Sequence, residues 1–274
     1  MFSSRDRAQA LEAARGFLEA DPAHNVLLLE ALCHPQPDAQ GQQFWWVVDG
    51  GPVVGFVARP SSASHALASP MDAASLDAVV AQVATAAPDL AGVSADAATA
   101  AALAGRWTDL TDGSAVPSFA QRLYEATNPV APPPTGGRAR LATEGEAPEL
   151  IAWLDQFGAE TGDPVPDAEW FVRRRLSEQA LWVWDDGGPV SMTARTAAVA
   201  GVNRVQAVYT PPSHRQKHYA ANLVAALTAA IGGEGLRAML YTDLANAASN
   251  AMYRALGYRA VVEVTRYRFT RPGR

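Results

Sequence analysis

Cysteine is almost missing from this chain of 274 residues, which has a single one, Cys33. One thiol cannot form an internal disulfide, and no CxxC or CxxH pair is present, so nothing points to an oxidising compartment or a zinc site. We interpret Cys33 as a small buried hydrophobic residue. The sequence predicts no metal site of any kind.

Long apolar runs and an excess of positive charge are missing too. No segment reaches the roughly 18 apolar residues of a membrane span, and charged residues interrupt the first twenty positions, unlike a signal peptide. The net charge of −6 argues against a protein that follows nucleic-acid phosphates, which needs concentrated Lys and Arg. We expect a cytoplasmic protein whose partners are small molecules or peptides, with no nucleic acid and no membrane.

Three common catalytic signatures are also absent, namely G-x-x-x-x-G-K-[ST], G-x-S-x-G and H-E-x-x-H. Their absence removes the simplest interpretations as a nucleotide hydrolase, a serine hydrolase or a zinc protease. The composition, with 49% hydrophobic and 18% charged residues, is that of an ordinary globular protein that can bury a sizeable core.

A proline- and glycine-rich run, NPVAPPPTGGRAR at residues 128–140, interrupts the chain near its middle. Such a run cannot sustain a helix or a central strand, so we interpret residues 129–137 as a linker between domains 1–128 and 138–274. On its two sides, QFWWVVDGGPVVGF and ALWVWDDGGPVSMT share Asp-Gly-Gly-Pro-Val and predict two similar hairpins. This weak repeat suggests duplication of a whole domain.

The second half reads as a mixed α/β domain in which antiparallel strands precede a strand-helix-strand unit. Beside the hairpin we expect helices at 148–157, 167–176, 219–231 and 247–256, and strands at 204–210, 237–242 and 261–269. The first half diverges after its hairpin, with a helix expected near 71–86 and no glycine-rich or basic loop. We therefore expect the first copy to be chemically silent.

One strand-turn-helix segment favours anion binding. The strand ends at Pro211-Pro212, Arg215 and Lys217 lie in the turn, and Leu223, Leu227 and Ile231 mark one face of the helix that follows. The unpaired amides and partial positive charge of a helix N-terminus suit a pyrophosphate. A basic, solvated helix start explains the same residues without any ligand.

The run VYTPPSHRQKHYAANLVAAL resembles motif A of the GNAT superfamily acetyltransferases, a strand followed by an R-x-x-G-x-G/A loop and a helix. The run LYTDLANAASNAMYRALGYRAV is similar to motif B, with Asn246, Tyr253, Gly257 and Tyr258 in the matching places. The resemblance is strong over residues 202–269 and reaches back to about Arg138. For the N-terminal half it rests only on the hairpin repeat. Together the motifs and the repeat imply two tandem GNAT-like domains of mixed α/β fold, the first one degenerate.

For the donor, the resemblance implies acetyl-CoA bound by the strand end and the loop, with no metal. The residues concerned are Val208, Tyr209, Thr210, Arg215, Gln216, Lys217, His218, Tyr219, Ala220 and Asn246. The chain departs from the family at His218 and Gln216, where Gly is usual or frequent. We expect a helix-start backbone with negative φ, which does not require Gly, so that the amides remain available while the imidazole points outward.

For catalysis, the resemblance implies direct attack of an amine on the thioester, without a nucleophilic residue. The N–H of Val208 would polarise the carbonyl, and Tyr253 would protonate the departing thiolate. Glu160 is the candidate general base, with Asp243 as the other carboxylate considered. Simpler explanations exist for two of these positions: Tyr253 as a core residue, and Asn246 as the N-cap of the next helix.

The sequence thus predicts an N-acetyltransferase acting on an amine of a small molecule or peptide, as a monomer or homodimer. The first copy would shape the acceptor cleft. Two alternatives remain: a noncatalytic CoA-binding or protein-interaction module, and an acyl-CoA enzyme of other chemistry, such as decarboxylation or transfer to oxygen or sulfur.

Overall fold

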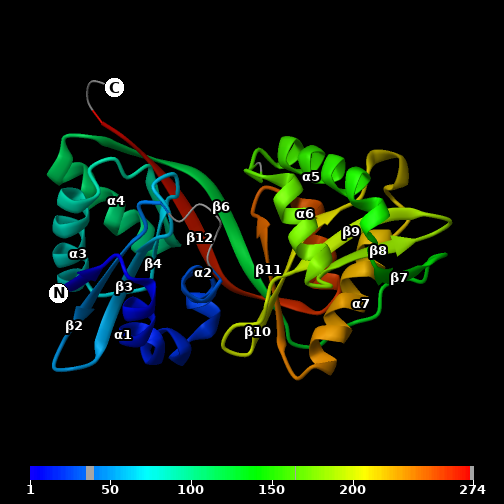
Figure 1. Cartoon of the computed structure of the whole chain (residues 1–274), viewed down its shortest axis with the longest axis horizontal. Helices are drawn as coiled ribbons and strands as arrows, with labels where there is room; N and C mark the ends of the chain where they lie inside the picture. The colour runs from blue at the N-terminus through cyan, green and yellow to red at the C-terminus, as the bar shows by residue number, and fades with distance from the viewer. Residues whose placement is uncertain (35–39, 164, 272–274) are drawn as a thin grey trace. The chain divides into compact units, whose positions relative to one another are not determined.

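The computed structural model describes residues 1–34, 40–163 and 165–271. Its helices and strands occur in one order twice along the chain: strand, two helices, three strands, helix, strand, helix and strand (Figure 1). The hairpins expected around Gly50 and Gly187 are the second and third strands of each repeat. The duplication that these hairpins predict is therefore confirmed.

The first repeat consists of β1 (Phe2–Ser4), α1 (Arg7–Ala20), α2 (Pro22–Cys33), β2 (Gln43–Val48), β3 (Val53–Arg59), β4 (Ala66–Ala68), α3 (Ala73–Ala86), β5 (Gly92–Asp96), α4 (Ala97–Thr111) and β6 (Ser114–Ala126). The second consists of β7 (Arg138–Leu141), the 3-10 turn η1 (Glu144–Glu146), α5 (Ala147–Thr161), α6 (Ala168–Ser177), β8 (Leu181–Asp185), β9 (Pro189–Arg195), β10 (Val202–Tyr209), η2 (Pro212–His214), α7 (Tyr219–Gly233), β11 (Arg237–Asp243), α8 (Ala247–Ala255) and β12 (Tyr258–Thr270). Every helix and strand expected in the second half is present, with ends displaced by a few residues.

The contacts divide the chain into two compact units that do not follow the order of the sequence. The first contains Met1–Leu123, Asp243–Ala245 and residues 261–271, and the second contains Tyr124–Thr242 and Asn246–Ala260. The long strands β6 and β12 therefore have residues in both units. Within the first unit, β12 pairs antiparallel with β5, with Thr265 opposite Ala95. The contacts thus place residues 261–271 apart from the remainder of the expected domain 138–274.

In the first unit, helices cover both faces of a sheet that runs β1-β2-β3-β4-β5-β12. Helices α3 and α4 pack on one face, where Trp107 of α4 stacks on Phe269 of β12 with ring centroids 4.2 Å apart. Helix α1 contacts β2 and β3, and α2 contacts β3 and β4. Both faces of the sheet are therefore buried, as the many apolar residues on its strands require.

In the second unit, the strand order β7-β8-β9-β10-β11 holds one parallel pair, β10 with β11, beside antiparallel neighbours. Helices α5 and α6 pack against Leu181 and Val183 of β8 and Met192 of β9. Helix α7 packs against Val205 of β10 and Leu240 of β11. A strand-helix-strand connection between parallel strands places the α7 N-terminus at the end of β10.

Most helix starts carry a short acidic or amide side chain that accepts a hydrogen bond from the first turn. These capping residues are Asp6, Asp21, Asp72, Asp96, Asp167 and Asn246. Such caps satisfy amides that the helix itself cannot pair. In the described part of the chain, no helix is both long enough and apolar enough to cross a membrane.

Candidate functional site

Helix α7 starts without the side-chain cap that most helices of this protein have. Strand β10 ends at Tyr209, and α7 begins at Tyr219 after the turn η2. Within the described residues, its N-cap His218 makes no capping hydrogen bond through the side chain. The first amides of α7 and the positive end of its dipole therefore remain available to an anion.

The loop before α7 adopts left-handed backbone at two residues that are not glycine. Gln216 has φ +65° and His218 has φ +61°. The expected negative φ at His218 is therefore wrong. Each such residue costs about 1–2 kcal/mol relative to right-handed backbone, although histidine tolerates this region better than most residues. Glycine adopts this conformation freely, which explains its frequency in the related loops.

The side chains of the loop point toward solvent. Gln216, Lys217 and His218 are all exposed, whereas Tyr219 is buried. The ammonium of Lys217 lies 5.9 Å from the centre of the Tyr219 ring, where a cation–π attraction holds it near the helix start. A positive charge thus accompanies the uncapped amides.

The equivalent helix of the first repeat, α3, has the opposite arrangement at its start. Asp72 accepts a hydrogen bond of 2.7 Å from the Ser75 amide. This backbone hydrogen bond holds the pKa of the Asp72 carboxyl below its usual value, so the group is a carboxylate at neutral pH. An anion approaching α3 would meet a negative charge, whereas α7 presents Arg215 and Lys217.

Strand β10 carries a bulge next to Val208 and Tyr209, two of the residues expected to bind the acetyl donor. Its antiparallel register with β9 pairs Gln206 with Ala194 and Tyr209 with Met192, so β10 has one extra residue in this stretch. Ala207 has φ +52°, and the parallel register with β11 stops at Val205 although β10 continues to Tyr209. Val208 therefore lies where β10 leaves its regular ladder, in the type of distortion that often borders functional sites.

Four residues expected at the site, namely Glu160, Tyr209, Thr210 and Arg215, meet in one polar cluster. Arg215 donates from Nη2 to both carboxylate oxygens of Glu160, at 2.8 and 2.7 Å, and from Nε to the Thr210 carbonyl at 2.9 Å. The Tyr209 hydroxyl lies 3.0 Å from Oε1 of Glu160 and 3.1 Å from Oε1 of Gln156, so these two acceptors share its single proton. The cluster ties the C-terminal end of α5 to the loop before α7.

The same cluster fixes the protonation of Tyr209. Burial raises the pKa of this phenol, and the hydrogen bond to Glu160 raises it further. Glu160 and Arg215 each keep 44% of their side chain exposed, so their ion pair is open to exchange with solvent ions. An anionic ligand that draws Arg215 away would release the Glu160 carboxylate.

Tyr253 lies on α8 in the interior of the second unit. Its ring packs at 5.9 Å from that of Tyr258 and at 6.4 Å from that of Tyr124. Burial is the main cause that raises the pKa of the Tyr253 phenol well above its usual value, and Tyr258 adds to it. The phenol is therefore protonated throughout the physiological range, but it is a poor acid in this state.

Asn246 and Asp243 make local hydrogen bonds. The Asn246 side chain accepts from the Ser249 amide at 2.9 Å and thereby caps α8, as the simpler explanation of this residue predicts. The Asp243 carboxylate accepts from the Ala245 amide at 2.8 Å in the turn after β11. Neither bond favours a catalytic role over a structural one.

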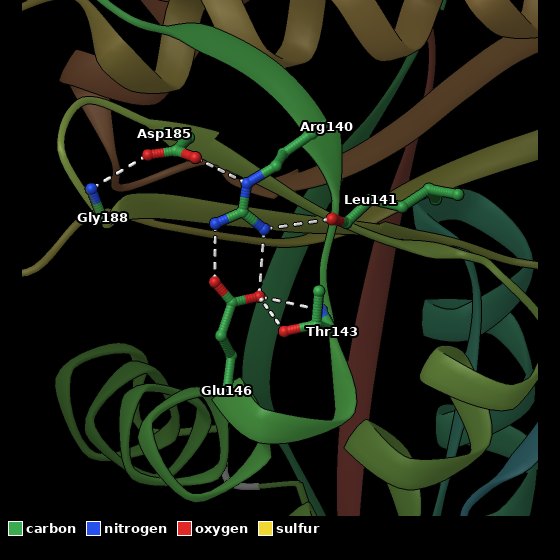
Figure 2. Close-up of polar contacts among 6 residues, drawn as sticks. All are labelled: Arg140, Leu141, Thr143, Glu146, Asp185 and Gly188. Carbon is green, nitrogen blue, oxygen red and sulfur yellow. Dashed lines mark hydrogen bonds and ion pairs between the residues drawn. The ribbon is translucent and has the colours of Figure 1, made fainter.

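A network around Arg140 supports the hairpin beside the site, as Figure 2 shows. Arg140 donates from Nε to Asp185 at 2.7 Å and from Nη2 to Glu146 at 2.6 Å. The Gly188 amide donates to Asp185, and the Thr143 amide donates to Glu146. Hydrogen bonds from Arg140 hold the pKa of both carboxyls below their usual values. The network therefore joins β7, η1 and the turn between β8 and β9.

That turn also reaches α7. The Tyr219 hydroxyl, at the first position of the helix, donates a hydrogen bond to the Asp186 carboxylate. This bond raises the pKa of Tyr219 above its usual value. The sequence identifies the Asp-Gly-Gly turn but not this bond, because the two residues are distant in the chain.

Comparisons with known proteins give a family for part of the chain and a fold for all of it. Residues 186–268 match the family described as FR47-like protein. None of the curated proteins matches this chain in sequence. The matched residues include the bulge of β10, the loop before α7 and α8.

Solved structures of acetyltransferases resemble the chain over nearly its whole length. A GNAT-family acetyltransferase from Colwellia psychrerythraea has a TM-score of 0.64 at 13% identity, covering 95% of this chain and 97% of that one. A GCN5-related N-acetyltransferase from Kribbella flavida has a TM-score of 0.57 at 21% identity, covering 96% of this chain and 96% of that one. A tandem GNAT protein from the clavulanic acid biosynthesis pathway has a TM-score of 0.55 at 15% identity, covering 99% of this chain and 97% of that one. The chain therefore has the tandem GNAT acetyltransferase fold, with an FR47-like C-terminal region.

Proposed function

We propose that this protein transfers an acetyl group from acetyl-CoA to an amine of a small molecule or peptide, and that the second repeat, residues 138–274, does the chemistry. The observation that carries the proposal is the uncapped start of α7 beside a basic loop. It distinguishes the second repeat from the first, whose equivalent helix is capped by Asp72. An anionic donor would therefore select the second repeat.

Donor binding would use backbone groups more than side chains. The amides of Gln216, Lys217, His218, Tyr219 and Ala220 would hold the pyrophosphate, with Arg215 and Lys217 supplying charge. The backbone at Val208, Tyr209 and Thr210 would hold the pantetheine arm. At the bulge, the N–H of Val208 would polarise the thioester carbonyl and stabilise the oxyanion that forms there.

Transfer would proceed by direct attack of the amine on the thioester carbonyl. The nitrogen forms the new bond to carbon, the bond from carbon to sulfur breaks, and the thiolate leaves with its electron pair. Glu160 would accept the proton of the amine, and Tyr253 would give a proton to the thiolate. Asn246 would contact the coenzyme from the start of α8.

A noncatalytic CoA-binding module is the second candidate, and two observations favour it. The Tyr253 phenol is buried and its pKa is raised, so proton transfer to a thiolate is uphill. Glu160 is engaged by Arg215 and Tyr209 and is not available as a base in this arrangement. Such a module would bind the coenzyme through the same loop but would not catalyse acetyl transfer.

The experiment that tests the proposal is calorimetric titration with acetyl-CoA and with free CoA, followed by an amine screen that detects released thiol. We expect dissociation constants in the micromolar range and thiol release that depends on the amine. Lys217→Ala should weaken binding, whereas Asp72→Ser, at the equivalent helix start of the first repeat, should leave it unchanged. Binding without thiol release favours the second candidate, and no binding contradicts both.

A further inference from the structure

The proline-rich segment at residues 128–137, which we call the strap, is hydrogen-bonded to other parts of the second unit, to which it belongs. The strap donates from the Val130 amide to the Leu256 carbonyl at 3.0 Å. It accepts from the Trp184 indole at the Gly136 carbonyl, at 2.7 Å. The strap therefore has fixed attachments to β8 and to the end of α8.

Glycines permit the close approach at both ends of the strap. A Cβ at Gly257 would lie 1.8 Å from the Asn128 carbonyl oxygen. Gly137 has φ +90°, and a Cβ there would lie 2.4 Å from the Asp185 carbonyl oxygen. No larger residue fits at either position without displacing backbone, so the segment does more than connect two domains.

Between these ends, Asn222 joins the strap to the loop before α7. Its amide nitrogen Nδ2 donates to the Pro133 carbonyl at 2.9 Å and to the His218 carbonyl at 3.0 Å. A side-chain amide has two N–H groups and can serve two carbonyls at once. His218 is the N-cap of α7 and has left-handed backbone without being glycine.

We propose that Asn222 is a positioning residue that couples the strap to the donor loop and keeps His218 in its left-handed conformation. The inference rests on the proposed function, because the loop is the proposed pyrophosphate site. With His218 held in this conformation, the first amides of α7 face outward from the loop. The backbone amide of residue 222 also donates to the His218 carbonyl, at 3.0 Å, so what the side chain adds is the tie to Pro133 of the strap. Without that tie, His218 is less restrained against the conformations that a residue with a Cβ prefers.

The composition of α7 supports this role for Asn222. Its first ten residues, Tyr-Ala-Ala-Asn-Leu-Val-Ala-Ala-Leu-Thr, contain four alanines, and Asn is a poorer helix former than Ala. Asn222 therefore weakens the helix locally unless its side chain makes useful bonds. Replacing it with alanine improves helix propensity, so any loosening of the loop in that variant comes from the lost hydrogen bonds.

The test compares Asn222→Ala with wild type by hydrogen exchange of the amides at residues 216–223 and by acetyl-CoA titration. We expect exchange about fivefold faster and affinity about fivefold weaker, the factor that corresponds to one lost hydrogen bond of ordinary strength. Trp184→Phe, which frees the Gly136 end of the strap, should give a smaller effect of the same sign. Thr228→Val, which removes the side-chain hydrogen bonds of Thr228 to the Val224 carbonyl and with the Tyr258 hydroxyl in the middle of α7, should not change exchange in the loop.

The decisive variant is His218→Gly, because glycine adopts left-handed backbone at no cost. In the His218→Gly background the effect of Asn222→Ala on loop exchange and affinity should be at most half of that in the wild type. His218→Gly alone should keep or improve affinity for the donor. A merely structural role for Asn222 predicts the same effect in both backgrounds, and that result overturns the proposal.

The two proposals fail separately. If wild type binds neither acetyl-CoA nor CoA, the proposed function is contradicted, while loop exchange in the four combinations of residues 218 and 222 still decides the role of Asn222. If donor binding is normal and loop exchange is the same with and without Asn222, the positioning role is contradicted and the proposed function stands.

Discussion

Tyr253 combines the position expected of a general acid with an environment that opposes proton release. Its ring lies among Tyr124, Tyr258 and the apolar residues of α7. Burial also raises the pKa of Tyr258, to about 12. A phenol in such surroundings gives up its proton only to a strong base held close to it, such as a thiolate that has not yet been solvated.

Tyr253→Phe separates catalysis from packing at this residue. If the hydroxyl protonates the thiolate, the variant loses about 10²-fold or more in turnover, since a general acid contributes roughly 10²–10⁴-fold. Affinity for acetyl-CoA should change little, because the hydroxyl acts in the transition state. Steady-state kinetics measures the turnover, and calorimetry on the same preparation measures the affinity for acetyl-CoA. Equal losses of turnover and affinity would exclude the role.

The pH dependence of turnover follows from the same environment. Because the pKa of Tyr253 is raised, its acid form persists above the ordinary phenol value near 10. We expect no loss of thiol release from Tyr253 ionisation between about pH 7 and 9. A descending limb in that range that disappears in Tyr253→Phe would show that the phenol ionises more easily than its burial implies.

Two ion pairs of Arg140 connect the hairpin of the second repeat to β7 and η1. Arg140 of β7 contacts Asp185 at the end of β8 and Glu146 of η1, and all three keep roughly a quarter or less of their side chains exposed. Removing the guanidinium would leave Glu146 and Asp185, both partly buried, without the cation that donates hydrogen bonds to them. Bonds of this kind are worth more than those of fully exposed ion pairs.

Arg140→Met should lower the free energy of unfolding by about 2 kcal/mol at pH 7, the scale of hydrogen bonds to charged groups. Because Arg140 lowers the folded pKa of Glu146 and Asp185, its stabilisation is present above their unfolded values of 4.5 and 3.8. It is lost as the pH falls through the lower folded values. Urea unfolding of wild type and variant should therefore differ at pH 7, and the difference should shrink as the pH falls below 3.8.

The control for this prediction is Arg173→Met, which removes an exposed ion pair within one turn of α6. An exposed pair of this type contributes little, so its loss should change stability by less than about 0.5 kcal/mol at any pH. A difference between wild type and Arg140→Met that is independent of pH would mean that lost packing, not charge, causes the effect.

At the scale of the whole chain, local patterns predicted the elements but not the partners that the elements find. Hairpins, helix starts and the strand-turn-helix follow from residues close together in sequence, such as the Asp-Gly-Gly turn around Gly187. The bond between Glu160 and Arg215 joins residues 55 positions apart. The side chain of Asn222 joins Pro133 of the strap to the His218 carbonyl. Such features belong to tertiary packing, which the sequence does not display locally.

The final strand shows the same limit on a larger scale. The alternation in residues 261–269 predicts a strand, and β12 includes it. Nothing in that alternation identifies β5 of the first repeat as the partner, because alternation shows which face of a strand is apolar and not which strand lies beside it. The domain boundaries expected at residues 128 and 138 come from the position of the linker. The two units defined by contacts depend instead on which strands pair, so residues 261–271 belong with β5 in the first unit.

This pairing predicts that residues 138–274 do not form a stable protein alone. The fragment lacks β5, against which β12 pairs from Val264 to Arg268, and it lacks Tyr124, a buried ring that donates to Asn250 at 3.0 Å. The fragment would leave the backbone of β12 unpaired along this edge, which favours aggregation. Size-exclusion chromatography and hydrogen exchange of residues 258–271 check this. Coexpression with residues 1–137 should restore both solubility and protection, because that fragment supplies β5 and Tyr124. If residues 138–274 alone remain monomeric with amides 264–268 protected, the pairing of β12 with β5 is not needed, and the second repeat folds without the first.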